Sequence, residues 1–335
     1  PVTITPIFKE KQGKEWISYG ADDNYGTFLE ELYLGSSINS AIINGVSEMI
    51  YGEGLDAHDR NDNEASKEQW LRLQMLLNES EPQVLQKCSM DLKLYGQCYI
   101  NTIWNNSRTR VVKFKHLPVN SMRPGVAGSD GHIPLYYHNN DWSNKRSKPD
   151  VIKTFSTEDR TEASRVLHIK RYAPSFHYMG IPDWNGSIGY VQLDISIQTF
   201  HLANISSGLF PSMLLNFSNG LPTDEEQRMI EQKVNEKFSG SANAGKVLIS
   251  FSDGSESQPT LTPIQNNGTD GMYEYLSNEV TTKVLTGHRV TSPLLFGVKG
   301  DGSGFGNNAD ELRDSYSLFH NTVIIPFQEL LLDGL

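Results

Sequence analysis

Two apolar stripes with helical spacing flank a short stretch of strand pattern in the second half of the chain. The first stripe predicts a helix over 187–208, because its apolar residues recur at intervals of three, four and seven. The second predicts a returning helix that ends at Gly287. The residues of the two stripes are Ile188, Val191, Ile195, Leu202, Ile205 and Leu209, and then Met272, Leu276, Val280 and Val284. Val191, Leu193, Ile195 and Ile197 also alternate, so a strand remains an alternative for the first stripe.

The segment between these helices predicts a strand-helix-strand unit. Residues 213–217 and 246–251 have strand patterns, and Asn219-Gly220 is typical of a turn after the first. Thr223 and Glu226 form a capping box that opens a helix ending near Gly240. A small module carried between two long helices is expected to project and to meet a partner.

Residues 1–186 predict helices followed by a mainly antiparallel sheet, which makes the fold class α+β. Residues 1–35 are expected to be extended, and helices are expected over 36–51, 64–77 and 82–95, the first capped by Ser36 or Ser37. Strands are predicted at 98–104, 110–117, 135–138, 151–155 and 166–169, the first two joined as a hairpin. The final helix, over 309–335, is expected to kink at Pro326.

Composition limits the ways in which this chain can meet a nucleic acid. The net charge is −11, which argues against a protein that grips DNA through a basic face but allows one that lets DNA slide past. No apolar run is long enough for a transmembrane helix, and no signal peptide is expected at the first residues. Cys88 and Cys98 have neither disulfide-framework nor zinc spacing, so two reduced, partly buried thiols are expected.

Candidate chemistry is sparse along the chain. The Gly300–Gly306 run has glycine at alternate positions but lacks the Gly-Lys-Ser/Thr ending of a phosphate-binding loop. A mobile surface or channel loop is the favoured interpretation, and a nucleotide-binding enzyme that uses this loop is the alternative. His116, His138 and His168 lie on predicted strands and are interpreted as satisfied sheet histidines rather than a site. No catalytic constellation, metal site or cofactor motif is present, so no enzyme is predicted.

The order of several short segments along the chain resembles a known family. These segments are Ile50-Tyr51-Gly52-Glu53-Gly54, Val166-Leu167-His168-Ile169-Lys170, Tyr178 to Pro182, Leu209-Phe210-Pro211, Gly240-Ser241-Ala242-Asn243-Ala244-Gly245-Lys246, Pro293-Leu294-Leu295-Phe296-Gly297, and Asn307-Asn308-Ala309-Asp310-Glu311. In this order the chain resembles the portal proteins of long-tailed bacteriophages and prophages. The Gly240–Lys246 and Pro293–Gly297 segments are the most specific.

The resemblance implies a ring, usually of twelve copies, at one capsid vertex of the virion, through which double-stranded DNA is packaged and ejected. It implies a wing over 1–186, a first stem helix over 187–208, a clip over 209–260 and a second stem helix over 261–287. A tunnel loop over 288–308 and a kinked wing helix over 309–335 complete the plan. Family members typically continue into a C-terminal crown, which this sequence, with its last residue at Leu335, is expected to lack. Ser292 stands where the family often has Val or Ile before the proline.

The resemblance also implies partners and contact residues, with no catalysis, no cofactor and no membrane. The partners are other copies of the chain, double-stranded DNA, the terminase large subunit, the major capsid protein and the head–tail connector, all met after synthesis in the bacterial cytoplasm. Tunnel-loop candidates for DNA contact are Lys299, Gly300, Asp301, Gly302, Gly304, Phe305, Asn307 and Asn308. Clip candidates for docking terminase or the connector are Gln227, Arg228, Glu231, Lys237 and Lys246. A different structural or adaptor protein of a virion is the second alternative.

Overall fold

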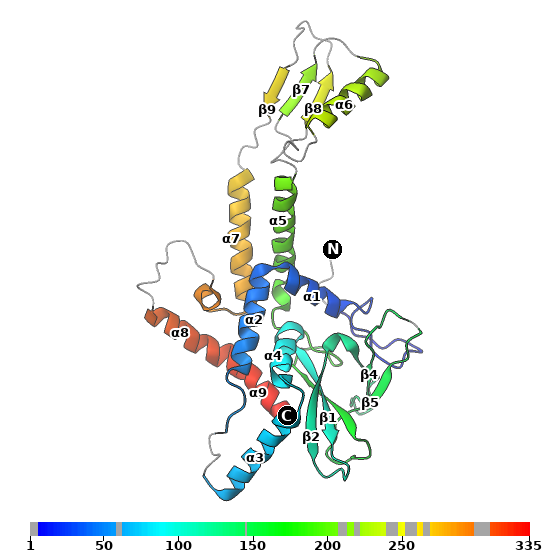
Figure 1. The fold of residues 1–335 in the computed structure, drawn as a ribbon, viewed down its shortest axis with the longest axis vertical. Coiled ribbons are helices and arrows are strands. Elements are labelled where there is room, and N and C mark those ends of the chain that lie inside the picture. Colours follow the sequence, from blue (N-terminus) through cyan, green and yellow to red (C-terminus); the bar gives the residue numbers. More distant parts are fainter. Residues whose placement is uncertain are drawn as a thin grey trace. The chain divides into compact units, whose positions relative to one another are not determined.

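The chain divides into two compact units (Figure 1). A computed structural model describes residues 6–57, 62–144, 146–206, 213–217, 222–238, 247–251, 260–263, 269–297 and 309–335. One unit comprises residues 1–191 and 282–335, and the other comprises residues 192–281. The mixture of helices and sheets confirms the predicted α+β class.

Four helices open the first unit: α1 (Tyr25–Gly35), α2 (Ser37–Tyr51), α3 (Glu64–Glu79) and α4 (Val84–Tyr95). Ser36 caps α2 as predicted, because its hydroxyl accepts a hydrogen bond from the Asn39 amide at 3.3 Å. The expectation that residues 1–35 are extended was wrong for α1. Its N-cap residue, Asn24, makes no side-chain cap, so the usual start signal is missing, and burial of Leu29 and Leu32 holds the helix instead.

Two three-stranded antiparallel sheets follow. The first has the order β2-β1-β6, with β1 at Gln97–Trp104, β2 at Val111–Leu117 and β6 at Ser164–Lys170. The second has the order β3-β4-β5, at Met122–Pro124, Leu135–His138 and Asp150–Lys153. In the first sheet Thr102 of β1 lies opposite Phe114 on one side and Arg165 on the other, which confirms the predicted hairpin.

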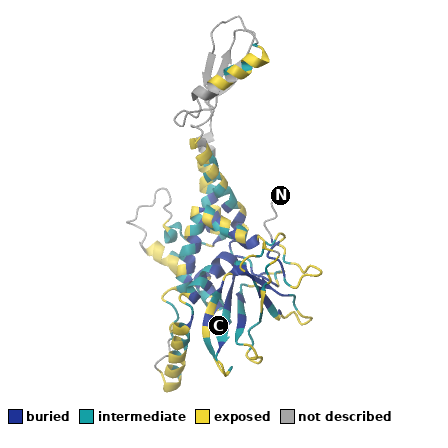
Figure 2. Ribbon diagram, turned by 45° about the vertical axis from the view of Figure 1, so that its right-hand side comes forward, coloured by how far each residue is buried: buried dark blue, intermediate teal, exposed yellow. Residues whose placement is uncertain are grey.

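The core of this unit lies where α2, α4 and β1 pack together, which Figure 2 shows as a dark blue zone. Residues that are completely buried there are Ile42, Ile43, Val46, Cys88, Leu92, Cys98, Tyr99 and Ile100. Cys88 and Cys98 are both free, and burial together with the neighbouring Cys88 thiol raises the pKa of Cys98 well above its usual value. These thiols therefore behave as small apolar core residues.

The C-terminal helix of the first unit is interrupted. Helices α8 (Ala309–Phe319) and α9 (Ile325–Gly334) are joined by a π-helical segment, η4 (His320–Ile324). The irregularity expected from Pro326 therefore takes the form of a π segment just before it, with Pro326 in the first turn of α9. Proline has no N–H to donate to the carbonyl four residues earlier, which here belongs to Thr322.

The second unit contains a three-stranded sheet and the larger parts of helices α5 (Ile188–Ser206) and α7 (Thr269–Gly287). Strands β7 (Met213–Phe217) and β8 (Val247–Phe251) are parallel and are connected through α6 (Asp224–Phe238). The capping box is present, since the amide and hydroxyl of Thr223 both donate to Glu226 Oε2 at 2.9 Å. Helix α5 shows that the strand alternative for its residues was wrong.

One strand of the second unit was missed in the sequence. Residues 260–263 were expected at the junction of the clip and the second stem helix, but they form β9 (Thr260–Pro263), antiparallel to β7 at the edge of the sheet. An edge strand tolerates Pro263, which has no N–H for a further partner. Helix α7 consequently begins at Thr269 rather than near residue 261.

Two glycines allow the turn between α4 and β1 to pack against the 178–182 loop. Gly96 ends α4 in the left-handed conformation, with φ of 74°. A Cβ on Gly96 would lie 2.1 Å from the carbonyl oxygen of Ile181, and a Cβ on Gly180 would lie 2.3 Å from that of Gly96. The chain can therefore approach itself here only without side chains.

Replacing Gly96→Ala is expected to destabilise the protein by about 3 kcal/mol, because backbone strain adds to a clash that the backbone must relieve. Gly131→Ala is the matched control: its φ is 79°, but its Cβ would have nothing within 4 Å. This control should cost only about 1 kcal/mol. Urea unfolding of both variants measures the difference, and equal losses would contradict the close packing of the turn.

Candidate functional site

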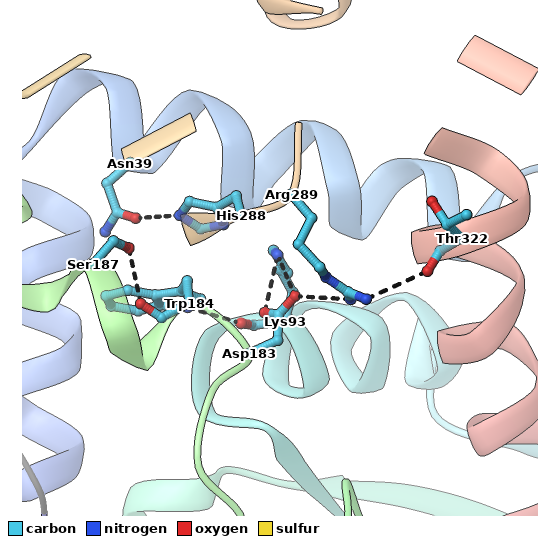
Figure 3. A network of polar contacts seen from close by, with 8 residues as sticks. All are labelled: Asn39, Lys93, Asp183, Trp184, Ser187, His288, Arg289 and Thr322. Carbon is cyan, nitrogen blue, oxygen red and sulfur yellow. Dashed lines mark hydrogen bonds and ion pairs between the residues drawn. The ribbon is translucent and has the colours of Figure 1, made fainter. Parts of the chain in front are cut away.

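A buried polar network joins the points at which the chain enters α5 and leaves α7. Figure 3 shows its eight residues, which come from α2, α4, the loop before α5, the residues after α7, and η4. They are Asn39, Lys93, Asp183, Trp184, Ser187, His288, Arg289 and Thr322. All eight belong to the first unit. The network therefore fixes the base of both long helices.

A fully buried ion pair lies at the centre of the network. Lys93 Nζ contacts both carboxylate oxygens of Asp183 at 3.0 Å, and the two side chains are 0% and 1% exposed. Burial lowers the pKa of Lys93, while the charge of Asp183 and its hydrogen bond act in the opposite direction. Arg289 adds a second cation, with Nη2 at 3.4 Å from Asp183 Oδ2. Asp183 thus holds α4 and the segment after α7 together.

Two stacked rings continue the network towards α2. The indole N–H of Trp184 donates to the Lys93 carbonyl at 3.1 Å, and the Trp184 ring stacks on His288 with centroids 5.6 Å apart. His288 Nε2 lies 2.8 Å from Asn39 Oδ1. Asn39 uses its amide nitrogen to donate to the Leu32 carbonyl, so its oxygen accepts and His288 Nε2 carries the proton.

The surroundings of His288 keep its ring neutral. Burial, and then the positive charge of Lys93, hold its pKa well below the usual 6.5. Its other nitrogen, Nδ1, is buried and has no hydrogen-bond partner among the residues that the structure describes. A proton added at Nδ1 would therefore create a buried charge beside another cation.

The start of α5 and the end of α7 approach each other closely. A Cβ on Gly287 would lie 2.3 Å from both Cβ and Oγ of Ser187. Ser187 Oγ donates to the Trp184 carbonyl at 2.8 Å, so this serine is itself fixed by the network. Glycine at 287 is required by this contact, because any larger side chain would overlap Ser187.

The segment from His288 to Gly297 leads from α7 towards the glycine-rich run and is held along its length. Arg289 adopts φ of 60°. Its Nη1 donates at 3.4 Å to the Thr322 carbonyl oxygen, to which Pro326 cannot donate because proline has no N–H. Thr291 Oγ1 donates to the Ser315 carbonyl of α8 at 2.7 Å.

Phe296 anchors the far end of this segment in the short helix η3 (Pro293–Phe296). Its ring meets Phe319 edge to face at 5.7 Å and leaves no room for a Cβ on Gly45 of α2, which would lie at 2.8 Å. The chain is therefore fixed up to Gly297.

The tunnel-loop candidates lie outside the described residues. They are Lys299, Gly300, Asp301, Gly302, Gly304, Phe305, Asn307 and Asn308. Among the clip candidates, Gln227 and Arg228 lie on α6, where Gln227 Nε2 donates to the Pro222 carbonyl at 3.1 Å and Arg228 is exposed. Glu231 and Lys237 also belong to α6, but their side chains are outside the described part, as is Lys246.

The three sheet histidines are not brought together, in agreement with their interpretation as structural residues. His116 Nε2 contacts Asp91 at 2.7 Å, His168 Nε2 contacts Gln97 Oε1 at 3.0 Å, and His138 Nδ1 lies 3.8 Å from Asp150. Within the described residues no group of three or more potential metal ligands occurs. The helices described include none with the length and apolar character that crossing a membrane requires.

Sequence reasoning missed the buried network. Lys93 and Asp183 are far apart in the chain, and no motif links them. One signal was present, since Lys93 lies between Leu92 and Leu94 on a helix with a strongly apolar face. A lysine in such a position needs a buried anionic partner.

Comparison with known proteins places this chain in one class, the portal proteins of phages. A family model described as phage portal protein matches residues 54–316, which is more than half of the chain. The chain therefore belongs to the phage portal protein family, which confirms the resemblance found in the sequence. Portal proteins are structural virion proteins and not enzymes, so the nucleotide-binding alternative has no support.

Solved structures show the same fold. The chain is similar to a protein in the neck of an empty gene transfer agent particle computed with C6 symmetry, with 12% identity, a TM-score of 0.64, and coverage of 98% of this chain and 81% of that one. It is also similar to a protein in the neck of a native particle computed with C12 symmetry, with 12% identity, a TM-score of 0.59, and coverage of 91% and 78%.

A sequence relative is an uncharacterized protein of Rickettsia bellii (strain RML369-C). It is 23% identical over 185 residues, which are 55% of this chain and 45% of that protein. The matched region thus spans less than half of the relative's length.

Removing one partner of the buried ion pair should be far worse than replacing both. Asp183→Leu leaves the charge of Lys93 uncompensated in the core, and a loss of about 3–5 kcal/mol in unfolding free energy is expected. A double variant, Lys93→Met with Asp183→Leu, should lose much less than the sum of the two single losses. Urea unfolding in a double-mutant cycle measures this coupling, and additive losses would show that the pair does not act as a unit.

The neutral state of His288 predicts a loss of stability in mild acid. Its folded pKa is lowered, so its contribution is complete above the unfolded value near 6.5 and is lost as the pH falls below it. The loss should reach about 1.4 kcal/mol per pH unit for this residue. Unfolding free energies of wild type and His288→Gln between pH 7.5 and 5 should converge in acid, and parallel curves would contradict a depressed pKa.

Proposed function

We propose that this chain forms a ring of identical copies at the vertex of a phage-like capsid and that double-stranded DNA passes through the ring. The family match and the similarity to neck proteins of gene transfer agent particles support this function. Twelve copies are proposed because one of those necks was computed with C12 symmetry. The virion is the corresponding location.

The observation that carries the proposal is the uncovered apolar surface of α5 and α7. From Gln192 to Ser206 no described side chain of α5 is buried, although Leu193, Ile195 and Ile197 are apolar. Leu202 and Ile205 are 66% and 68% exposed, and Tyr275 of α7 is 65% exposed. Phe200 stacks on Tyr273 at 4.8 Å, so the two helices contact each other at these rings.

Large apolar side chains on a helix are stabilised when neighbouring elements remove them from water. In a ring, each subunit uses two different surfaces to contact the copies on either side of it. Neighbouring copies of α5 and α7 would bury these residues and form the wall of the channel. The proposed stem therefore consists of α5 and α7, with its second helix starting at Thr269.

We assign the remaining regions by the plan of the family. The wing comprises residues 1–186 and the helix after 309, and the clip comprises the sheet β8-β7-β9 with α6. The tunnel loop over 288–308 would contact DNA through Lys299, Asn307 and Asn308, with its glycines allowing each copy to adjust to a helical duplex. Its first part, up to Gly297, is held by the contacts of Thr291 and Phe296 and would fix the point from which the glycine-rich run emerges.

The clip would dock the terminase large subunit during packaging and the head–tail connector afterwards. Candidates for this contact are Gln227, Arg228, Glu231, Lys237 and Lys246. The major capsid protein would surround the wing.

Ring assembly tests this function directly. Purified chain should form rings in negative-stain images, with a mass near 450 kDa for twelve copies of 37.6 kDa. Leu202→Asp with Ile205→Asp places charges on the proposed stem interface and should shift mass photometry towards the monomer by at least about tenfold in population. Met229→Asp is the matched control, because Met229 is equally apolar and exposed but lies on α6.

Rings that form equally well in all three proteins would show that α5 does not supply the interface. A wild-type chain that stays monomeric at high concentration would contradict the ring itself and would favour a different structural or adaptor role in a virion.

A further inference from the structure

The chain leaves α7 through an arginine whose backbone conformation normally belongs to glycine. Arg289 has φ of 60°, its amide donates to the Thr286 carbonyl at 2.9 Å, and the Val290 amide donates to the Leu285 carbonyl at 3.0 Å. These two bonds form the Schellman motif, in which the residue with positive φ is usually glycine. A larger residue is strained there, because its Cβ comes too close to the following carbonyl oxygen.

Glycine is the residue with positive φ at other helix ends of the first unit. Helices α2, α4 and η3 end at Gly52, Gly96 and Gly297, whose φ values are 55°, 74° and 72°. The turn after α7 would therefore form more easily with glycine than with arginine. A residue held in a strained conformation indicates a role for its side chain.

The Arg289 side chain links two elements that are distant in the sequence (Figure 3). Its Nη2 lies 3.4 Å from Asp183 Oδ2, in the loop before α5, and its Nη1 donates at 3.4 Å to the Thr322 carbonyl of η4. The planar guanidinium presents its donors in a fixed fork, so one arginine can hold two acceptors in a set geometry. One side chain thus fastens the end of α7 to the π segment.

This outer contact differs from the inner ion pair of the same network. Lys93 and Asp183 are 0% and 1% exposed and lie 3.0 Å apart, whereas the Arg289 side chain is 47% exposed and its contact is longer. Salt screens an exposed pair strongly and a buried pair much less. Release of the guanidinium would also let the Arg289 backbone relax. The network therefore has an inner part that stays closed and an outer part that can open.

Thr291 makes a second tie along the same stretch of chain. Its hydroxyl donates to the Ser315 carbonyl of α8 at 2.7 Å, two residues beyond Arg289. This hydrogen bond joins two uncharged groups, so salt does not screen it. Of these two ties, the one at Arg289 is therefore the salt-sensitive one.

From these observations we infer that Arg289 is a positioning residue whose guanidinium acts as a salt-sensitive clasp. When closed, the clasp holds the π segment against the end of α7 and so sets the direction of α8. When open, it leaves η4 free to rearrange while the inner ion pair keeps α4 in place. The clasp does not depend on ring formation, but its consequence for the tunnel loop of a channel rests on the proposed function.

Hydrogen–deuterium exchange of the full chain, measured by mass spectrometry, tests the clasp. Exchange is compared at about 0.1 M and about 1 M salt, between which the screening length falls from about 10 Å to about 3 Å. In wild type, the higher salt should speed exchange in residues 318–326 by about threefold or more. Residues 84–95 of α4, which hold the inner pair, should exchange equally at both concentrations. This comparison needs no variant.

Arg289→Gly separates a clasp from an ordinary helix end. Exchange in residues 318–326 should become about threefold faster or more and should lose its dependence on salt. Peptides over residues 286–291 should stay as protected as in wild type, because glycine suits the Schellman turn.

Arg108→Gly is the matched control for relief of backbone strain. Arg108 has φ of 58°, and its Nη1 donates to the Asn105 carbonyl within its own turn. This variant removes an arginine from the same backbone conformation and should leave exchange in residues 318–326 like that of wild type.

Three results would overturn the inference. The first is wild-type exchange in residues 318–326 that is the same at both salt concentrations. The second is exchange in this stretch that Arg289→Gly and Arg108→Gly leave equally unchanged, which would mean that the guanidinium does not hold η4. The third is equal acceleration of residues 84–95 and 318–326 by Arg289→Gly, which would mean general destabilisation of the unit. Ring formation is measured separately, so failure of the clasp and failure of the proposed function are distinguishable.

Discussion

The buried ion pair of Lys93 and Asp183 is the interaction on which the first unit depends most. Taking two charges out of water costs several kcal/mol per ion, so such a pair persists only where its partners are fully hydrogen-bonded. Here the Asp183 carboxylate pairs with Lys93 of α4 and with Arg289 of the segment after α7. The neighbouring Trp184 donates a hydrogen bond to the Lys93 carbonyl of α4. This carboxylate thus sets the position of α4 relative to the start of α5 and the end of α7. A purely apolar contact would not fix this geometry with the same directional precision, because dispersion forces are not directional.

The sequence was informative where local signals are strong. The Ser36 cap, the Thr223–Glu226 capping box and the β1–β2 hairpin follow from residues a few positions apart, and the structure confirms each of them. Helix α1 and strand β9 were missed, because the first lacks a side-chain cap and the second is only four residues long. The network at Lys93 could not be derived, since residues bonded directly to each other in it are as far apart as 249 positions and only folding brings them together. The family was identified from the order of short segments, which carries information that no single segment has.

The exposed surfaces indicate a protein built for assembly rather than for a solitary existence. Helices α3 and α5 both display apolar side chains that their own units leave uncovered, and α8 displays Leu312, Tyr316 and Leu318. The buried histidines His168 and His288 are neutral members of hydrogen-bonded sets, and the buried Lys93 and Asp183 form an ion pair. The chemistry of this chain therefore lies in its surfaces, while its buried polar groups set geometry.

The π-helical segment His320–Ile324 has a consequence for how this architecture can vary. A π segment accommodates one residue more than an α-helix would over the same rise, so the residues before it are rotated by about 100° relative to those after it. Loss of a single residue here would remove the π segment and turn every α8 side chain by that angle relative to α9. The number of residues in the π segment thus determines which face α8 presents. It also determines the direction from which the chain enters α8 after residue 308. Insertion or deletion at this point could redirect that face in one step, without any change in the amino acids that compose it.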